Sequence, residues 1–312
     1  MLGLNKERHK MKKTFILGVG AQKAGTTWLH GQLSKNEAID FGFRKEYHVF
    51  DIVEALEKSE HGKRPIGRYE AIIDAIAKHS EDPELIECPT VKSPLRNALL
   101  ELAFIKNTNT YFNYFNQLAG SGADLKAVGD ITPAYALLSQ QSLQSIKQSL
   151  EARDFSIKVI FLMRDPIERI WSSARMKKRE LSSSASETFN EFKFLNKLPQ
   201  SHRFIQKSVY QKTVRNLEAV FRPDQIHYGF YETLFDASFK TDLQQFLGFP
   251  LQAFDSSEVF NASPKSTVMP LALKQKLAET FSDTYTFCAD RFGAQVTDVW
   301  SGYSSRSIQL GH

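Results

Sequence analysis

The sequence predicts an α/β fold in which a central parallel sheet of the phosphate-loop type is flanked by helices on both faces. Short apolar runs typical of buried strands alternate with longer stretches of helical periodicity. The first apolar run also ends in a glycine-containing turn that opens into a helix. Such an alternation is typical of parallel sheets, whose ligands bind at the carboxyl ends of the strands. The predicted strands are 14–19, 126–130, 157–163 and 226–230, and the predicted helices include 66–80, 94–105, 139–151, 205–221, 238–247 and 270–290.

The turn after the first strand has the spacing of a phosphate-binding loop. Four residues separate Gly20 from Gly25, and Thr27 stands where the triphosphate-binding version has its Ser or Thr. That version needs a lysine directly after its second glycine, but Thr26 occupies this position. Backbone N–H groups and a helix N-terminus still favour an anion. The nearby lysine is Lys23, inside the loop, so we expect a metal-free site in which Lys23 meets a phosphate and a leaving oxygen.

A second anion-binding motif follows the predicted strand 157–163. Arg164 stands at the end of the strand, and Asp165 and Pro166 favour a helix start there. Ser172 lies about two turns into that helix, so the Arg164 guanidinium and the Ser172 hydroxyl can share one phosphate. For this motif taken alone, the alternative is an Arg–Asp pair that closes the strand–helix turn.

Together the two motifs resemble the superfamily of sulfotransferases that use PAPS, 3′-phosphoadenosine 5′-phosphosulfate. The resemblance covers roughly residues 14–292, and Arg164 and Ser172 match the element that holds the 3′-phosphate in that superfamily. It implies transfer of a sulfuryl group from PAPS to a hydroxyl or amine, with PAP as the product and without a metal. The residues similar to the 5′-phosphosulfate loop are Gln22, Lys23, Ala24, Gly25, Thr26, Thr27 and Trp28.

Polar residues beyond the first helix form a possible catalytic group. Sulfuryl transfer needs a base for the proton of the acceptor and positive charge where negative charge builds up. Glu46, His48 and Asp51 form a Glu-x-His-x-x-Asp cluster next to Arg44 and Lys45. The cluster resembles a segment of the heparan-sulfate-type branch, which implies Glu46 as the base, His48 as the reserve and Asp51 as a neighbour. The alternative is a polar loop that only packs and caps the next helix.

The segment 129–135, GDITPAY, resembles the same branch and also departs from it. The related stretch is Glu-Lys-Ser/Thr-Pro-x-Tyr, whose lysine serves the active site. Ile131 stands at the position of that lysine, so its charge is missing or comes from another residue, with Lys92 and Lys45 as candidates. This departure argues against copying the glycosaminoglycan acceptor of that branch. The aspartate and tyrosine of the segment are expected either in the core or in contact with the substrate.

Later segments complete the expected site. Tyr231 follows the predicted strand 226–230 and is either a stacking partner for the adenine or a core tyrosine. In the loop 261–267, Lys265 is placed by the resemblance near the 3′-phosphate, with a solvated loop lysine as the alternative. The stretch 174–206 is expected to form either a lid over the acceptor or a surface helical excursion.

The whole-chain properties narrow the class of protein. With 312 residues and no linker or repeat, we expect a single domain over 1–312 whose first 12 residues are a flexible extension. The net charge of +5 suits a polyanionic cofactor, and no dense basic stripe suggests nucleic acid. Cys88 and Cys288 lack metal or disulfide spacing and are expected to be free thiols. With neither a signal peptide nor a membrane span predicted, we expect a cytoplasmic protein.

Two rival functions stay open. A P-loop kinase or other ATP-dependent phosphotransferase is disfavoured by the missing lysine after Gly25. A non-catalytic module that senses PAP would keep Lys23, Arg164 and Ser172 but would need no base. The acceptor, which is a small molecule, a lipid or a glycan, and the oligomeric state are not fixed by the sequence.

Overall fold

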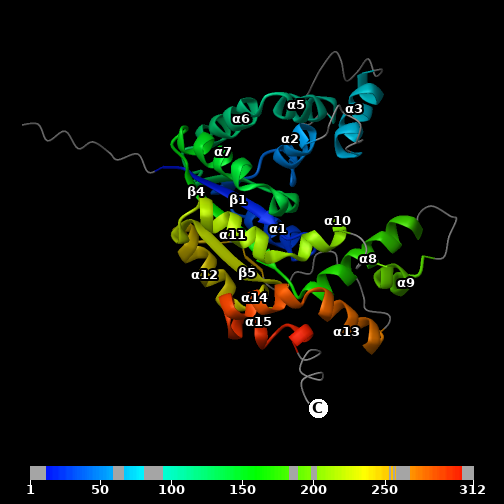
Figure 1. Ribbon diagram of the computed structural model, residues 1–312. Helices are drawn as coiled ribbons and strands as arrows, with labels where there is room; N and C mark the ends of the chain where they lie inside the picture. Colours follow the sequence, from blue (N-terminus) through cyan, green and yellow to red (C-terminus); the bar gives the residue numbers. More distant parts are fainter. Residues whose placement is uncertain are drawn as a thin grey trace, which may run out of the picture.

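The central element of the fold is a five-stranded parallel sheet with the strand order β2-β3-β1-β4-β5 (Figure 1). The computed structural model describes residues 12–58, 67–80, 94–182, 189–197, 202–252, 254–255, 257 and 268–303. All four predicted strands are confirmed to within one residue at each end, and β2 is an additional strand of two residues. The strands are β1 (Thr14–Gly20), β2 (Ile39–Asp40), β3 (Ala127–Ile131), β4 (Ser156–Met163) and β5 (Ile226–Phe230).

Strand β1 lies in the middle of the sheet, and its sequence suits that place. All of its residues are buried, as expected for a parallel strand that is covered on both faces. Gly18 pairs with Ile131 of β3, and a Cβ atom on Gly18 would lie 2.8 Å from the Ile131 side chain. Ile131 therefore fills space that only a glycine at position 18 leaves open, and its side chain belongs to the core.

Helices flank the sheet on both sides, so the predicted α/β fold is confirmed (Figure 1). The helices α2, α3, α5 and α6 gather on the β2–β3 side, and α12, α14 and α15 lie on the β5 side. Helix α7 packs against β4 and α11. The helices on the β2–β3 side and around the sheet are α1 (Thr26–Ser34), α2 (Val49–Lys58), α3 (Gly67–Ser80), α5 (Pro94–Lys106), α6 (Thr108–Gly120), η2 (Pro133–Leu137) and α7 (Gln140–Glu151). They are followed by α8 (Pro166–Ser182), α9 (Glu191–Lys197), α10 (His202–Ile205), η4 (Gln206–Ser208), α11 (Tyr210–Val220), η5 (Pro223–Gln225), η6 (Tyr231–Thr233), α12 (Ala237–Leu247), α13 (Leu271–Thr280), α14 (Ser282–Phe292) and α15 (Ala294–Thr297).

Two of the predicted helices are interrupted. The predicted helix 205–221 is α11 preceded by the 3₁₀ turn η4, and Val209 between them has non-helical backbone angles. The predicted helix 270–290 is two helices that meet at the buried Phe281. In both places apolar residues continue at helical spacing because they face the core. The hydrophobic pattern therefore does not indicate where the helix is interrupted.

Helix α6 was not predicted. Its sequence, TNTYFNYFNQLAG, is rich in Asn, Thr and aromatic residues, which have low helix propensity. The helix forms because Asn107 accepts a hydrogen bond from the Asn109 amide at its start and because Tyr111, Phe112 and Phe115 are buried. Tertiary packing outweighs local propensity in this segment.

The segment after α14 closes over the end of β4. Asp165, which is 1% exposed, accepts hydrogen bonds from the Tyr285 hydroxyl at 2.5 Å and from the Gly302 amide at 2.9 Å. Trp300 is also buried, and its Nε1 donates to Glu232 Oε2 at 2.9 Å. The residues that follow β4 and β5 are thus fixed by the C-terminal part of the fold.

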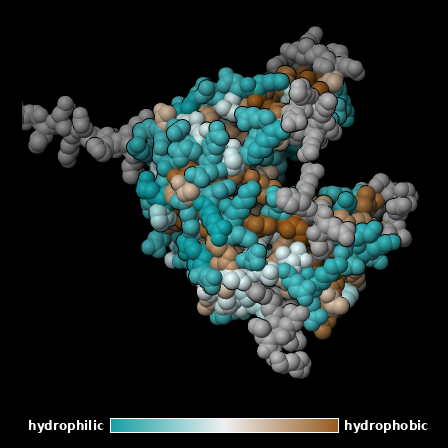
Figure 2. Space-filling view, viewed as in Figure 1, coloured by the Kyte–Doolittle hydropathy of each residue, from teal (hydrophilic) through white to brown (hydrophobic). Residues whose placement is uncertain are grey.

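The surface seen in Figure 2 is mostly hydrophilic, and a notch opens between the α2–α3–α5 helices and the α8–α9 region. Among the described residues, no helix has the length and apolar character that crossing a bilayer requires.

Candidate active site

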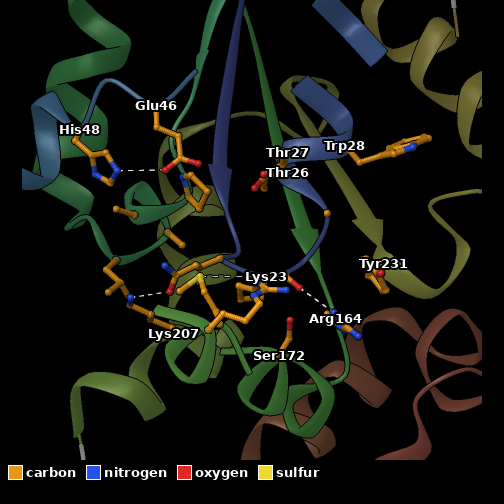
Figure 3. A pocket seen from close by; sticks show the side chains of 18 of the residues that line it. Lys23, Thr26, Thr27, Trp28, Glu46, His48, Arg164, Ser172, Lys207 and Tyr231 are labelled. Atoms are coloured by element: carbon orange, nitrogen blue, oxygen red, sulfur yellow. Dashed lines mark hydrogen bonds and ion pairs between the residues drawn. The ribbon is translucent and has the colours of Figure 1, made fainter. Parts of the chain in front are cut away.

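A cavity of about 500 Å³ lies at the carboxyl ends of β1, β3, β4 and β5, where parallel α/β sheets bind their ligands. Most of the residues singled out from the sequence line it. Figure 3 shows Glu46 and His48 at one end, Arg164, Ser172 and Tyr231 at the other, and Lys23 between them. We call these the base end and the donor end. The remaining lining residues are Gln22, Gly25, Thr26, Thr27, Trp28, Pro133, Ala134, Ala136, Leu137, Met176, Arg179, Lys207 and Phe235.

The loop after β1 is shaped by its glycines. Gly25 has a φ of 91°, and a Cβ atom there would lie 2.3 Å from Leu234 Cδ2, so a larger residue does not fit. Helix α1 begins directly afterwards at Thr26. The amides of its first turn have no acceptor within the helix and carry the positive end of the helix dipole. Thr27 lines the cavity, so the loop and the start of α1 face it, and anion binding by this loop stays a prediction.

Lys23 lies at the middle of the cavity among other cations. Its Nζ atom is 3.7 Å from Met176 Sδ, and its carbonyl oxygen accepts a hydrogen bond from Arg164 Nη1 at 3.3 Å. Burial lowers the pKa of Lys23, and the charges of Arg179, Arg164 and Arg175 lower it further. A cation held against other cations gains more from a bound anion than an isolated lysine does, because the anion also relieves their repulsion.

Arg164 forms the centre of the donor end. Its guanidinium Cζ lies 4.0 Å from the centre of the Tyr231 ring, and its side chain is 12% exposed. Its buried Nε has no hydrogen-bond partner among the described residues, and Ser172 lines the same cavity. A buried guanidinium with an unused donor beside a hydroxyl fits a phosphate. One face of Tyr231 is covered by Arg164, so an adenine could stack only on the other.

The base end consists of a chain of charged side chains. His48 Nδ1 lies 2.9 Å from Asp51 Oδ2, and His48 Nε2 lies 3.3 Å from Glu46 Oε2. Lys45 forms an ion pair with the other oxygen of Glu46. The cluster predicted from the sequence therefore assembles, with Asp51 behind His48 and outside the cavity lining.

These contacts set the charge state of both members of the Glu46–His48 pair. Burial alone would raise the pKa of Glu46, but hydrogen bonds from His48 and Lys45 outweigh it and lower the pKa to about 2. Burial alone would lower the pKa of His48, but hydrogen bonds to Asp51 and Glu46 raise it to about 9. At neutral pH, Glu46 is thus a carboxylate and His48 an imidazolium.

Two cations of the cavity, Arg179 and Lys207, and the neighbouring Met176 were not predicted from the sequence. Arg179 and Met176 follow Ser172 on the same face of α8, at positions seven and four residues later, so helical spacing from Ser172 would have found them. Lys207 lies in η4, and its Nζ donates to Gln22 Oε1 at 2.8 Å, across 185 residues of sequence. No local pattern indicates such a contact.

The position of Lys207 is set by a buried arginine. Arg169 of α8 is 1% exposed, and its guanidinium donates to Ser208 Oγ at 2.5 Å and to the Phe204 carbonyl at 3.1 Å. These bonds tie η4 to α8 and hold Lys207 over the phosphate loop.

Other predicted residues have a structural place. Ala24 is fully buried, and Trp28 is 2% exposed with its ring among Phe235, Phe239 and Phe254. Asp130 and Tyr135 are buried in the core, which is the first of the two alternatives expected for them. Cys288 is a free, buried thiol. Lys92, Lys265, Cys88 and the N-terminal residues 1–11 lie outside the described residues, as does part of the stretch 174–206.

A parallel sheet with a glycine-containing loop after its central strand and a cavity at its strand ends defines an α/β protein of the phosphate-loop type. Its family is shown by comparison with known proteins: residues 13–269 match the sulfotransferase domain, and the chain belongs to that family. Among the described residues, no group of three or more His, Cys, Asp or Glu is arranged to hold a metal ion.

Solved sulfotransferases have a similar fold. One from Alicyclobacillus acidocaldarius aligns with a TM-score of 0.59 and 20% identity over 92% of this chain and 98% of that chain. The sulfotransferase domain of the Synechococcus PCC 7002 olefin synthase aligns with a TM-score of 0.45 and 15% identity over 92% and 98% of the two chains. No curated protein matches the chain significantly. The family rests on the match to the sulfotransferase domain, and none of these comparisons assigns the chain to the heparan-sulfate-type branch.

Proposed function

We propose that this sulfotransferase uses PAPS and transfers its sulfuryl group to a hydroxyl or amine, releasing PAP. The observation that carries the proposal is the position of Lys23. It lies in one cavity between the carboxylate of Glu46 on one side and the side chains of Arg164 and Ser172 on the other. PAPS has phosphate groups at two separate places, and the cavity offers a site for each. ATP would need a cation directly after Gly25, where this chain has Thr26.

Donor binding follows from the charges at the donor end. Arg164 and Ser172 hold the 3′-phosphate, and the amides of the loop together with Lys23 hold the phosphosulfate. Tyr231 contacts the adenine with the face of its ring that is turned away from Arg164. By the family resemblance, Lys265 adds a contact to the 3′-phosphate.

Glu46 is the base in this mechanism. As the acceptor oxygen or nitrogen forms its bond to sulfur, its proton moves to Glu46, and the bond from sulfur to the bridging oxygen of the 5′-phosphate breaks. His48 cannot take that proton at neutral pH, because its raised pKa keeps it protonated. The imidazolium instead orients Glu46, and Asp51 orients the imidazolium.

The leaving group is stabilised from the other side. The electron pair of the broken bond goes to the bridging oxygen, where Lys23 and the amides of the loop stabilise the negative charge. Lys207 and Arg179 line the same cavity. They supply the positive charge that the lysine of the related branch would give, since Ile131 stands at its position and is buried in the core. Binding of the acceptor displaces Lys45 from Glu46 and so raises the pKa of this carboxylate towards a value suited to a base.

Calorimetry and turnover test the proposal together. We expect PAP to bind without a divalent cation and ATP with Mg²⁺ not to bind; the reverse result would favour a kinase. Turnover is then measured with labelled PAPS and a library of phenols, alcohols, amines and glycans. Tight PAP binding with no transfer to any of these acceptors would favour the PAP-sensing module.

A further inference from the structure

We propose that Asp130 is a positioning residue for the reaction, a role that rests on the proposed function of Glu46 as the base. Through the hydroxyl groups of Thr132 and Tyr135, Asp130 fixes the backbone at residues 47–49 and aims Glu46 and His48 into the cavity. Asp130 itself does not line the cavity and is fully buried at the end of β3.

The carboxylate of Asp130 accepts hydrogen bonds from three hydroxyl groups. Thr132 Oγ1 donates to Oδ1 at 2.6 Å, and the hydroxyls of Tyr135 and Tyr111 donate to Oδ2 at 2.8 and 3.0 Å. Burial raises the pKa of Asp130 to about 6, so it is mainly ionised above neutral pH. Because each hydroxyl group donates its hydrogen bond to Asp130, the lone pairs of the hydroxyl oxygen point towards other donors.

Two of these hydroxyl oxygens, those of Thr132 and Tyr135, accept hydrogen bonds from the backbone amides of residues 47–49 at the base end. The Tyr47 and His48 amides point at Thr132 Oγ1, at 2.9 and 3.5 Å, and the Val49 amide donates to the Tyr135 hydroxyl at 3.2 Å. Helix α2 begins at Val49, so the amides of His48 and Val49 are among the donors that a helix start leaves without partners. The buried negative charge of Asp130 also stabilises the positive end of this helix.

The backbone in this segment needs such support. His48 has a φ of 55°, a left-handed conformation that non-glycine residues rarely adopt. Tyr47, between the two cavity residues, is fully buried, and its hydroxyl donates to the Phe41 carbonyl at 2.9 Å. With Tyr47 anchored in the core and His48 turned, the side chains of Glu46 and His48 both face the cavity.

Thr132 is also tied to the phosphate loop side of the site. Its amide donates to the carbonyl of Gly18 in β1 at 2.9 Å, and Pro133, the next residue, lines the cavity. The distance between the base and the loop is therefore set by one short stretch of backbone after β3. An error of about 1 Å in such a distance can cost roughly 100-fold in rate.

Thr132→Val and Thr132→Ser separate positioning from packing. Valine keeps the shape of threonine but cannot accept the Tyr47 and His48 amides, whereas serine keeps the hydroxyl. With the acceptor found in the library screen, we expect Thr132→Val to lower kcat by about 10- to 100-fold. The affinity for PAP should stay within about threefold, because the bond from Thr132 to Gly18 comes from the backbone amide, which valine keeps. Thr132→Ser should restore kcat to within about threefold of the wild type.

A second readout does not depend on turnover. The charged groups that act on His48 include Glu46, Asp51 and Arg68 and, from the core, Asp130. In a variant that keeps Asp130, NMR titration of the His48 ring measures how closely Glu46 and Asp51 approach it. In Thr132→Val we expect the pKa of His48 to fall towards its ordinary value, and in Thr132→Ser to stay near that of the wild type. Asp130→Asn should shift it further in the same direction, because this variant also removes a negative charge that acts on His48, so Thr132→Val is the variant that tests positioning.

The outcomes distinguish this role from a general effect on folding. Wild-type kcat and an unchanged pKa of His48 in Thr132→Val would overturn the proposal. An equal loss of kcat and PAP affinity, with a lowered Tm and no rescue by serine, would also overturn it and assign Thr132 to the core. If Glu46→Gln keeps full activity, it is the assignment of the base that fails, whatever Thr132→Val does.

Discussion

The two ends of the cavity are each organised around a buried aspartate, but the partners of these aspartates come from different parts of the chain. At the base end, Asp130 is held by Tyr111, Thr132 and Tyr135, all within 25 residues of it in the sequence. At the donor end, the partners of Asp165 include Tyr285 and Gly302, which lie 120 and 137 residues away.

The donor end has a second long-range support. Glu232, next to Tyr231, accepts the Asp165 amide at 3.0 Å and Trp300 Nε1 at 2.9 Å. The distant partners, Tyr285, Trp300 and Gly302, lie beyond residue 269, where the match to the sulfotransferase family ends. The comparison teaches that the base end depends on residues inside the matched region, whereas the donor end also depends on a segment outside it. Substitutions can therefore disturb one end without the other.

Lys23 serves both ends, so we expect its loss to have the largest effect. Lys23→Ala removes the charge that stabilises the leaving oxygen and should lower kcat by roughly 1,000-fold, measured with labelled PAPS at saturating donor. The exposed Lys212 of α11 is a matched control, and Lys212→Ala should leave kcat unchanged. Near-normal turnover in Lys23→Ala would rule out its role at the leaving group.

Glu46→Gln tests the base end alone. A neutral amide cannot accept the proton of the acceptor, so kcat should fall by about 100-fold or more, while the affinity for PAP measured by calorimetry should hardly change. Glu57→Gln, on the exposed side of α2, is the control for a lost carboxylate. A change confined to KM would show that Glu46 binds substrate and is not the base.

Arg164→Lys tests the donor end alone. Lysine keeps the charge but loses the planar fork and the stacking on Tyr231, so the Kd for PAP should rise by about 10- to 30-fold. The kcat at saturating PAPS should change much less, because the base end is untouched. Arg222→Lys, at a side chain that is 63% exposed, is the control. An unchanged Kd would contradict the assignment of Arg164 to the 3′-phosphate.

Trp300→Phe tests whether the C-terminal segment supports only the donor end. It removes one hydrogen bond to Glu232 and should lower the free energy of unfolding by about 1 kcal/mol. We expect a Kd for PAP raised by roughly threefold, with the pKa of His48 unchanged in an NMR titration. A shifted pKa of His48 would show that the two ends are coupled.

The pH dependence of stability should also differ between the ends. Burial raises the pKa of Glu232 from 4.5 to about 7, so its contribution to the free energy of unfolding is full below pH 4.5 and is lost as pH rises through 7. The pKa of His48 is raised from 6.5 to about 9, so its contribution is full below pH 6.5 and is lost as pH rises through 9.

Thermal denaturation between pH 4 and 10 resolves these two windows. We expect Glu232→Gln to reduce the slope of the lower window, to which Asp130 with its pKa of about 6 also contributes, and His48→Gln to reduce that of the upper one, with Tm differences of a few degrees (roughly 2–4 °C). If either variant changed both windows, the two ends would not be independent.

The sequence predicts the parts of this molecule that depend on local patterns. The four long strands, the phosphate loop and the Glu46–His48–Asp51 cluster each lie within a short stretch and were predicted correctly as structure. The roles of these residues stay predictions. Helix α6 was missed because its propensity is poor and packing decides its conformation.

What the sequence could not predict depends on contacts between distant segments. Lys207 donates a hydrogen bond to Gln22 across 185 residues of sequence, and Asp165 accepts one from the Gly302 amide across 137 residues. Tyr135 looks equally suited to the core and to the substrate until the structure shows its hydroxyl bonded to Asp130. Such contacts are properties of the assembled sheet.

The C-terminal support of Asp165 has a consequence for how the protein is made. A chain leaves the ribosome from its N-terminus, so the residues around Asp130 are available together long before Tyr285 and Gly302 are synthesised. The partners that align Glu46 can meet on a nascent chain, whereas Asp165 obtains its last hydrogen bond only after residue 302 has been released. The donor end is therefore completed only after residue 302 has been synthesised, and until then the nascent protein lacks the finished donor end.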